Sequence, residues 1–287
     1  MKKVVIVGAS GFVGTSLVEM FHNENFEVIS VQRKDLENIP KLVACFEKST
    51  LVINLAGANI VSRWSDEYKK LLYSSRINTT QTLLKAFEQT IQKPKLFIST
   101  SAVGIYKNDA IYDENSENLG DDFLANLCKD WEKEALKAQE FGIRTAIFRF
   151  GIVMGKGGAL EKMLPPFKLG FGGTIGDGSQ PFSFVHIEDL KEAYNFLLQN
   201  EELSGVFNLT APIFTTNKGL TQALGKTLHR PTLFPVPLFV LKLIFGEGAK
   251  VLTDGQKVIP NRLMNSGFHF KFKNIEDTIE NLVGSKN

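Results

Sequence analysis

The chain has 287 residues, of which 43% are hydrophobic and 22% charged, and its formal net charge is +2 at pH 7. These values are ordinary for a globular protein, and so small a net charge gives no overall reason to expect binding to nucleic acid or to a membrane. The two cysteines, Cys45 and Cys128, have neither metal-ligand spacing nor a disulfide pattern. We therefore expect no metal site, and a reducing, cytoplasmic location.

A glycine motif follows the first apolar strand. Val4–Val7 runs directly into Gly8, Gly11 and Gly14, and an amphipathic stretch comes next. This order is typical of a tight turn that brings the backbone close to a pyrophosphate, followed by a helix whose N-terminal amides face negative charge. An ordinary strand-to-helix turn is the alternative. Because the glycines follow an apolar strand at once, we interpret the motif as a dinucleotide-binding turn.

Short apolar strands and longer helical patterns alternate through the first two-thirds of the chain. After the first strand come a helix near Ser10–Asn23, strands at Glu27–Val31 and Leu51–Leu55, helical periodicity over Ser65–Thr90, a strand at Leu96–Ser99, a helix at Phe123–Phe141 and a strand at Arg144–Phe150. Such alternation predicts an α/β fold, a Rossmann-type doubly wound parallel sheet with helices on both faces. In these sheets the ligand lies at the carboxyl ends of the strands.

Beyond residue 151 the sequence becomes richer in glycine and proline. Glu188–Asn200 is expected to form a helix and Val206–Leu209 one more strand of the sheet. The apolar segment Leu238–Phe245 is too short to span a membrane, so we expect a helix buried in the core. The alternation of Phe268–Phe272 is strand-like.

These patterns divide the chain into two parts. We predict a dinucleotide-binding domain made of residues 1–155 and 185–212. Residues 156–184 and 213–287 are predicted to form a small mixed domain on the substrate side.

The end of the second strand indicates which dinucleotide is bound. An enzyme that uses NAD carries an acid there for the ribose hydroxyls, whereas this strand ends in Gln32, Arg33 and Lys34. A guanidinium holds a 2′-phosphate bidentately, and a carboxylate would repel it. We therefore predict NADP. Asp35 leaves an alternative open, because it would serve as the ribose acid if the strand ended two residues later.

Several motifs together resemble the extended short-chain dehydrogenase/reductase superfamily. Within it, the chain is similar to an atypical branch of "epimerase family" proteins, which are related to sugar-nucleotide epimerases and end in a small C-terminal domain of unknown function. The residues that carry the resemblance are Asn54–Gly57, Arg63-Trp64, Arg76–Thr80, Ser101–Tyr106, Gly158–Leu160, Pro165–Phe167, Gly172-Gly173, His186–Asp189, Asn208–Pro212, His229–Pro231 and Gly255–Phe268.

The resemblance implies a set of cofactor-binding residues. It places Gly8, Ser10, Gly11, Phe12 and Val13 at the pyrophosphate, and Gln32 and Arg33 at the adenosine end. It places Leu55, Ala56 and Gly57 beside adenine and ribose. The segment Phe150–Ile152, which ends in Ile152, is expected to border the nicotinamide. Arg76 is in position to approach the cofactor from the next helix, although a surface ion pair is an equal alternative.

The resemblance also implies a site for chemistry, which is incomplete. Superfamily members use a serine, a tyrosine and a lysine four residues after the tyrosine. Ser101 fills the serine position, but if Glu132 marks the register of the next helix, Leu124 and Cys128 stand where the tyrosine and lysine belong. Tyr106 is a candidate for the missing proton donor, and a packing aromatic is the alternative.

Other groups have mainly structural interpretations. Cys128 is expected to be a buried, inert thiol. His186 reads as a strand-end histidine and Asp189 as a helix-capping acid. Arg63 and Trp64 lie in a long loop and are candidates to hold a substrate.

Two functions follow from these observations. The first is an NADP-dependent oxidoreductase or epimerase that acts on a small molecule, either a sugar nucleotide or another carbonyl compound. The second is a nonenzymatic NADP(H)-binding sensor or regulatory scaffold, which the absence of the tyrosine and lysine favours. The sequence has neither a basic cluster nor an aromatic platform that would support nucleic-acid binding. It leaves open whether the chain forms an oligomer.

Overall fold

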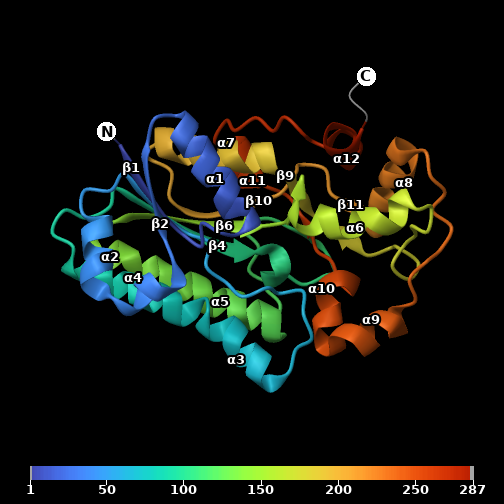
Figure 1. Cartoon of the computed structure of the whole chain (residues 1–287), viewed down its shortest axis with the longest axis horizontal. Coiled ribbons are helices and arrows are strands. Elements are labelled where there is room, and N and C mark those ends of the chain that lie inside the picture. Colours follow the sequence, from blue (N-terminus) through green and yellow to red (C-terminus); the bar gives the residue numbers. More distant parts are fainter. Residues whose placement is uncertain (1, 285–287) are drawn as a thin grey trace.

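A six-stranded parallel sheet forms the centre of the protein (Figure 1), which is described here for residues 2–284 of a computed structural model. The strands lie in the order β10-β6-β4-β3-β1-β2. Their bounds are β1 (Lys3–Val7), β2 (Glu27–Val31), β3 (Leu51–Asn54), β4 (Leu96–Ala102), β6 (Arg144–Phe150) and β10 (Gly205–Leu209). The order reverses beside β1, and this confirms the predicted doubly wound α/β fold.

Helices cover both faces of the sheet (Figure 1). One face packs against α1 (Phe12–Asn23) and α7 (Ile187–Gln199). The other packs against α2 (Ile39–Phe46), α4 (Ile77–Gln89) and α5 (Phe123–Leu136), which a 3-10 helix, Lys137–Phe141, extends. Burial on both faces explains why the central strands are continuous apolar runs rather than alternating ones.

A second, smaller core lies beyond the carboxyl end of β6 and is built from segments on either side of α7 and β10. Its buried side chains include Met154, Phe184, Leu224 and Ile279. Its elements are β7 (Ile152–Gly155), α6 (Gly158–Lys168), β8 (Pro181–Phe182), β9 (Phe184–His186), β11 (Thr215–Thr216), α8 (Asn217–Leu228) and α12 (Ile275–Val283). β7 pairs with β9 in parallel, and β8 pairs with β11 in antiparallel.

The remaining elements connect this smaller core to the sheet. They are β5 (Ile111–Tyr112), α9 (Leu238–Phe245), α10 (Lys250–Thr253), β12 (Lys257–Val258) and α11 (Asn261–Asn265). β12 pairs with β5 from the first half of the chain. Leu263 of α11 and the following Phe268 pack into the core under the sheet rather than into the smaller core. The C-terminal segment therefore contacts both parts of the molecule.

The helix predicted over Ser65–Thr90 is two helices, α3 (Asp66–Ser74) and α4. The helix is interrupted at Ser75 and Arg76, whose side chains bind the backbone of Ala58. The Ser75 hydroxyl accepts the Ala58 N–H at 2.9 Å, and Arg76 donates to the Ala58 carbonyl at 3.0 Å. Periodicity did not reveal the break because apolar residues continue in register on both sides of it.

The segment Leu238–Phe245 forms the predicted helix, α9, but the prediction that it is buried is wrong. Only Leu241 is buried, whereas Leu238, Phe239, Leu243 and Ile244 are exposed. The helix lies at the end of the molecule opposite α2 (Figure 1), away from the sheet core. No helix within residues 2–284 has both the length and the apolar character needed to cross a membrane.

The strand-like alternation of Phe268–Phe272 does not form a strand, and that expectation is also wrong. Phe268, Phe270 and Phe272 are buried, but no strand of the described residues 2–284 pairs with them. The backbone N–H groups of Lys271 and Phe272 instead donate to the Asp189 carboxylate at 2.8 and 2.9 Å. Alternate burial against helices, rather than pairing in a sheet, produces the pattern.

Candidate functional site

The predicted cofactor residues meet at one edge of the sheet. In the parallel register Val7 lies between Val31 and Asn54, and Asn54 pairs with Ser99. The turns that begin at Gly8, Gln32 and Leu55 therefore leave the sheet side by side. Ser101 and Arg149 are paired a little further along on β4 and β6. A ligand that crosses the carboxyl ends of the strands reaches all of these turns.

The glycine turn requires glycine at specific positions. Gly8 has φ of +85°, in the left-handed region, and a Cβ there would lie 2.9 Å from the carbonyl carbon of Leu55. A Cβ on Gly14 would lie 2.4 Å from the Gly8 oxygen. Gly11 caps α1 without a side-chain hydrogen bond, so within the described chain the first-turn amides have no capping side chain. Such a helix start fits a phosphate group.

Phe12 links this turn to the smaller core. Its ring packs on Gly155, Gly157 and Gly158, where an added Cβ would lie 2.5, 2.9 and 2.8 Å from ring atoms. The glycines at 155–158 thus leave room for Phe12 beside the pyrophosphate turn. The sequence predicts Phe12 at the cofactor, but it gives no sign of the contact between Phe12 and these glycines beyond the clustering of the glycines.

The residues that follow β2 are predicted to lie at the adenosine end of the cofactor. Those that are exposed include two cations, and the first acid of this segment, Asp35, is paired. Gln32, Arg33 and Lys34 are exposed, and Arg33 has no hydrogen bond or ion pair within residues 2–284. Asp35 is buried; its carboxylate accepts the Gln32 N–H at 2.8 Å and pairs with Lys41 at 2.6 Å. The hydrogen bond from Lys41 lowers the pKa of Asp35. Because Asp35 is occupied by these two contacts, the geometry disfavours the alternative that it holds the ribose of NAD.

Side chains that pack against the turn Leu55–Gly57 hold it in place. Asn54 accepts the Ala56 N–H at 3.2 Å and donates to Thr80 at 3.0 Å. The Arg76 guanidinium packs under Gly57, where a Cβ would lie 2.9 Å from Cζ, and stacks over Trp131 at 5.3 Å. Burial lowers the pKa of Arg76.

Arg76 therefore supports the turn Leu55–Gly57. Within residues 2–284 it donates to the Leu72 and Ala58 carbonyls rather than forming the surface ion pair that was the alternative. Asn78, on the same helix, is exposed. Thr80, rather than Asn78, supports the turn, because it accepts the hydrogen bond from Asn54. The sequence did not indicate this role of Thr80.

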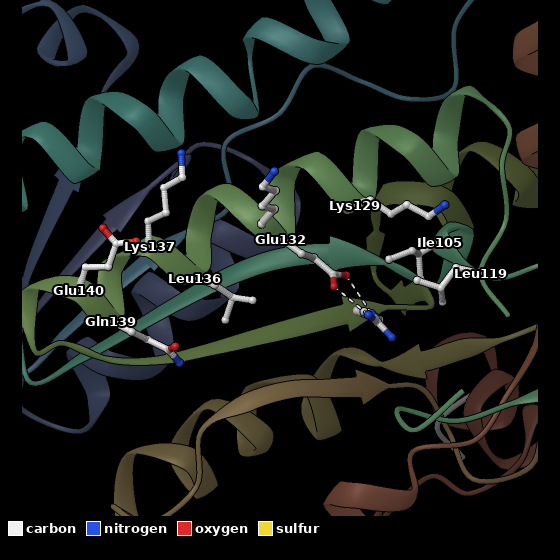
Figure 2. Close-up of a pocket in the computed structure, with 10 residues that line it drawn as sticks. Ile105, Leu119, Lys129, Glu132, Leu136, Lys137, Gln139 and Glu140 are labelled. Atoms are coloured by element: carbon white, nitrogen blue, oxygen red, sulfur yellow. Dashed lines mark hydrogen bonds and ion pairs between the residues drawn. The ribbon is translucent and has the colours of Figure 1, made fainter. Parts of the chain in front are cut away.

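A chain of buried polar side chains runs beneath the sheet edge. The Ser101 hydroxyl donates to Glu132 Oε1 at 2.6 Å. Arg149 donates to the same carboxylate twice, from Nε and from Nη2, each at 2.8 Å. Figure 2 shows Glu132 pointing from α5 toward this guanidinium. Ser101 is 1% exposed. Its hydroxyl hydrogen is committed to Glu132, so only its lone pairs remain for another partner.

Tyr106 belongs to the same buried chain. Its hydroxyl accepts from Arg149 Nη1 at 2.6 Å and lies 2.9 Å from Asn208 Oδ1 and 3.0 Å from the Asp113 carbonyl. Burial raises the pKa of Tyr106 despite the positive charge of Arg149. The geometry therefore favours the packing alternative over the predicted role as proton donor.

Hydrophobic packing occupies the positions of the usual tyrosine and lysine. Leu124 lies against Gly104, where a Cβ would be 2.6 Å from Leu124 Cδ2. Cys128 is buried, and burial raises the pKa of its thiol to about 12. A thiol with so high a pKa stays protonated near neutral pH, as expected of an inert cysteine.

Two other predicted groups have structural contacts. His186 caps α7 by accepting the Glu188 N–H at 3.0 Å. Arg63 donates to the Leu243 carbonyl, and Trp64 is buried with its N–H donated to the Ile60 carbonyl. None of these contacts places the side chain at the cofactor edge.

A shallow groove of about 580 Å³ lies along α5 (Figure 2). Lys129, Lys133 and Lys137 line it together with the Glu132–Arg149 pair. None of the predicted cofactor residues lines this groove. It is therefore distinct from the glycine-turn edge.

The fold and the glycine-turn edge define a nucleotide-binding Rossmann protein of the extended short-chain dehydrogenase/reductase type. The model of the NAD dependent epimerase/dehydratase family matches residues 4–210, and a domain of unknown function, DUF1731, matches residues 236–282. The chain therefore belongs to the NAD dependent epimerase/dehydratase family, and the resemblance seen in the sequence is confirmed.

Three similar proteins cover almost the whole chain. The epimerase family protein SDR39U1 homolog, chloroplastic, of Arabidopsis thaliana is 38% identical over 98% of this chain and 86% of its own length. The crystal structure of human epimerase family protein SDR39U1 with NADPH is 34% identical over 98% of each chain, with a TM-score of 0.89. A nucleoside-diphosphate sugar epimerase from Corynebacterium glutamicum is 30% identical over 99% of this chain and 58% of its own, with a TM-score of 0.79.

Proposed function

We propose that this chain is an NADP-dependent oxidoreductase or epimerase that acts on a small molecule, either a sugar nucleotide or another carbonyl compound. The observation that carries the proposal is the adenosine end: Arg33 is exposed and unpaired within the described residues, and Asp35 is turned into a contact with Lys41. The human relative crystallised with NADPH supports the same cofactor.

The residues present fit NADP along the whole edge. The first-turn amides of α1 would bind the pyrophosphate, Arg33 the 2′-phosphate, and the turn Leu55–Gly57 the adenosine side. Ile152 would border the nicotinamide. When bound, NADP supplies the hydride chemistry at the nicotinamide, and the protein's part is to bind, to orient and to exclude water.

We place Ser101 rather than Tyr106 at the substrate oxygen. In the structure the Ser101 hydroxyl donates to Glu132, so its lone pairs can accept a hydrogen bond from a substrate hydroxyl. In the reduction of a carbonyl compound the hydroxyl would instead rotate to donate to the carbonyl oxygen, and the proton that joins the product oxygen would come from water. Ser101 is buried, so it reaches a substrate only if its hydroxyl rotates or if the covering side chains move. Arg149 keeps Glu132 in place through its two hydrogen bonds.

The test is oxidation of bound NADPH, followed by its absorbance, with a panel of sugar nucleotides and simple carbonyl compounds. We expect at least one compound to be reduced, and Ser101→Ala to slow the reaction at least tenfold. Ser99→Ala is the matched control, because Ser99 is equally buried and its hydroxyl has no partner within the described chain. Equal rates for Ser101→Ala and wild type would remove Ser101 from the reaction.

A second function remains supported by a specific observation. Leu124 and Cys128 fill the positions of the usual proton donor and lysine, and neither can donate a proton near neutral pH. A nonenzymatic NADP(H)-binding sensor would bind NADPH saturably and change its affinity for a partner. Stoichiometric transfer of hydride from bound NADPH to any compound of the panel would rule this function out.

A further inference from the structure

A group of large apolar side chains is exposed on the smaller part of the molecule. We call it the apolar patch, and its members are Leu169, Phe171, Leu233, Phe234, Leu238, Phe239, Leu243 and Ile244. Phe239 and Leu243, one turn apart on α9, are 70% and 73% exposed. Single exposed apolar residues are ordinary, but a gathering of this kind marks a surface that binds something.

The patch comes from two segments of the chain that lie side by side. The Phe234 N–H donates to the Gly172 carbonyl at 3.3 Å, and the Val236 N–H donates to the Thr174 carbonyl at 2.7 Å. The rings of Phe171 and Phe234 are 5.8 Å apart. These contacts hold residues 169–176 beside residues 233–238, which lead directly into α9.

The surroundings of the patch carry positive charge. Residues 162–176 and 226–246 contain no aspartate or glutamate, and they contain five cations: Lys162, Lys168, Lys226, Arg230 and Lys242. Three of them have defined places beside the patch or within it. Arg230 Nε donates to the Lys168 carbonyl at 3.2 Å, directly before Leu169, and Lys242 lies on α9 between exposed apolar residues.

A further cation lies at the end of α9. Arg63 Nη1 donates to the Leu243 carbonyl at 3.1 Å, which brings a guanidinium from the first half of the chain to the patch. The acid next to α9, Glu247, pairs with Lys69. The other acid close to the patch is Asp177, which directly follows Gly176 beside Leu238, and the cations named above outnumber it. The apolar patch therefore has a basic margin.

We propose that the apolar patch docks onto an anionic lipid bilayer. A bilayer surface accepts Leu and Phe side chains below its headgroups, and its negative potential attracts nearby Lys and Arg. A second copy of this chain is a poorer occupant, because a two-fold axis would bring two basic margins together.

The dimensions of α9 fit a helix that lies in the interface. Its eight residues extend about 12 Å, well short of a bilayer core. Docking through this helix would place the smaller part of the molecule against the lipid, with α2 at the opposite end (Figure 1). The docking depends on neither the cofactor nor the reaction, so it can hold or fail separately from the proposed function.

The test is flotation of the full-length protein with lipid vesicles. We expect binding to vesicles of phosphatidylcholine mixed with phosphatidylglycerol and little binding to phosphatidylcholine alone. The double variant Phe239→Ser/Leu243→Ser should bind the mixed vesicles at least tenfold more weakly, since burial of each side chain contributes to the partitioning. Lys168→Glu/Lys242→Glu should weaken binding to the mixed vesicles and reduce its dependence on salt.

Controls separate the patch from general stickiness and from misfolding. Ile91→Ser changes an isoleucine that is 88% exposed in the Rossmann part, and it should leave vesicle binding unchanged. Both double variants should keep the wild-type circular dichroism and NADPH affinity. The proposal is overturned if wild type does not float with the mixed vesicles, if it floats equally with phosphatidylcholine alone, or if sedimentation shows a dimer that the serine variant dissociates.

Discussion

The Glu132 carboxylate is buried between α5 and β6, and the three hydrogen bonds that it accepts explain why it is tolerated there. Burial of an unpaired charge costs several kcal/mol. Here the carboxylate accepts two hydrogen bonds from Arg149 and one from Ser101, and the third guanidinium nitrogen binds the Tyr106 hydroxyl. Removal of one member leaves the others buried without partners. A single substitution in this group therefore lowers the free energy of unfolding by more than the net contribution of the group to stability suggests.

The first prediction concerns this ion pair. Glu132→Gln leaves the Arg149 guanidinium buried without a counter-charge, and we expect the free energy of unfolding to fall by about 3 kcal/mol. Urea denaturation measures the change. The control is Glu134→Gln, which breaks a partly exposed pair with Lys137 on the same helix and should cost less than about 1 kcal/mol. Similar losses in the two variants would show that burial of the Glu132 pair is unimportant.

Among the elements, the start of α1 is tied to the start of α6 through Phe12. The ring fits only because residues 155, 157 and 158 lack side chains. The position of the glycine turn therefore depends on a loop that lies more than a hundred residues later in the sequence.

The second prediction follows from this packing. Gly155→Ala places a methyl group about 2.5 Å from the Phe12 ring, so we expect a loss of about 1–3 kcal/mol in the free energy of unfolding and weaker NADPH binding. Calorimetry of unfolding and of cofactor binding measures both. The double variant Phe12→Leu/Gly155→Ala removes the clash with the ring, although Ile187 remains 3.1 Å from the added Cβ, and it should recover part of the stability. If it recovers none, the contact with Phe12 is not the cause.

The junction of β9 and α7 provides the third prediction, which concerns pH. Burial lowers the pKa of His186 to about 4, against about 6.5 in an unfolded chain. Between these values the unfolded state binds a proton that the folded state does not, so stability is present above about pH 6.5 and is lost as pH falls toward 4. His186 should therefore contribute a loss of about 2 kcal/mol between pH 7 and pH 5.

The measurement is urea unfolding of wild type and His186→Asn at both pH values. Asparagine also caps helices but does not titrate in this range. The variant should lose less stability than wild type on acidification. Equal pH dependence in the two proteins would contradict the assignment to His186.

At the scale of the whole molecule, the sequence predicted the sheet well and the surface poorly. Apolar runs such as Val4–Val7 are buried on both faces, and the glycines that follow form the tight turn that their spacing predicts, so local pattern was sufficient. The contacts of Tyr106 with Arg149 and Asn208 join residues that are 43 and 102 positions apart. No local pattern contains such pairs.

Apolar composition and net charge were equally ambiguous at this scale. The sequence of α9 suits a buried helix and an exposed one alike, and only its place at the end of the molecule distinguishes them. The chain's net charge of +2 averages over the basic margin of the apolar patch, so it gave no sign of a locally cationic surface.

The most direct test of the account is the affinity of the protein for NADPH and NADH, measured by calorimetry on wild type and Arg33→Ala. We predict that wild type binds NADPH at least tenfold more tightly than NADH, because a guanidinium that holds a 2′-phosphate contributes about 1.5–3 kcal/mol. Arg33→Ala should remove this preference and leave NADH binding unchanged, whereas Arg230→Ala, a remote control, should change neither. NADH affinity equal to or tighter than that for NADPH in wild type, or an unchanged NADPH affinity in Arg33→Ala, would contradict it.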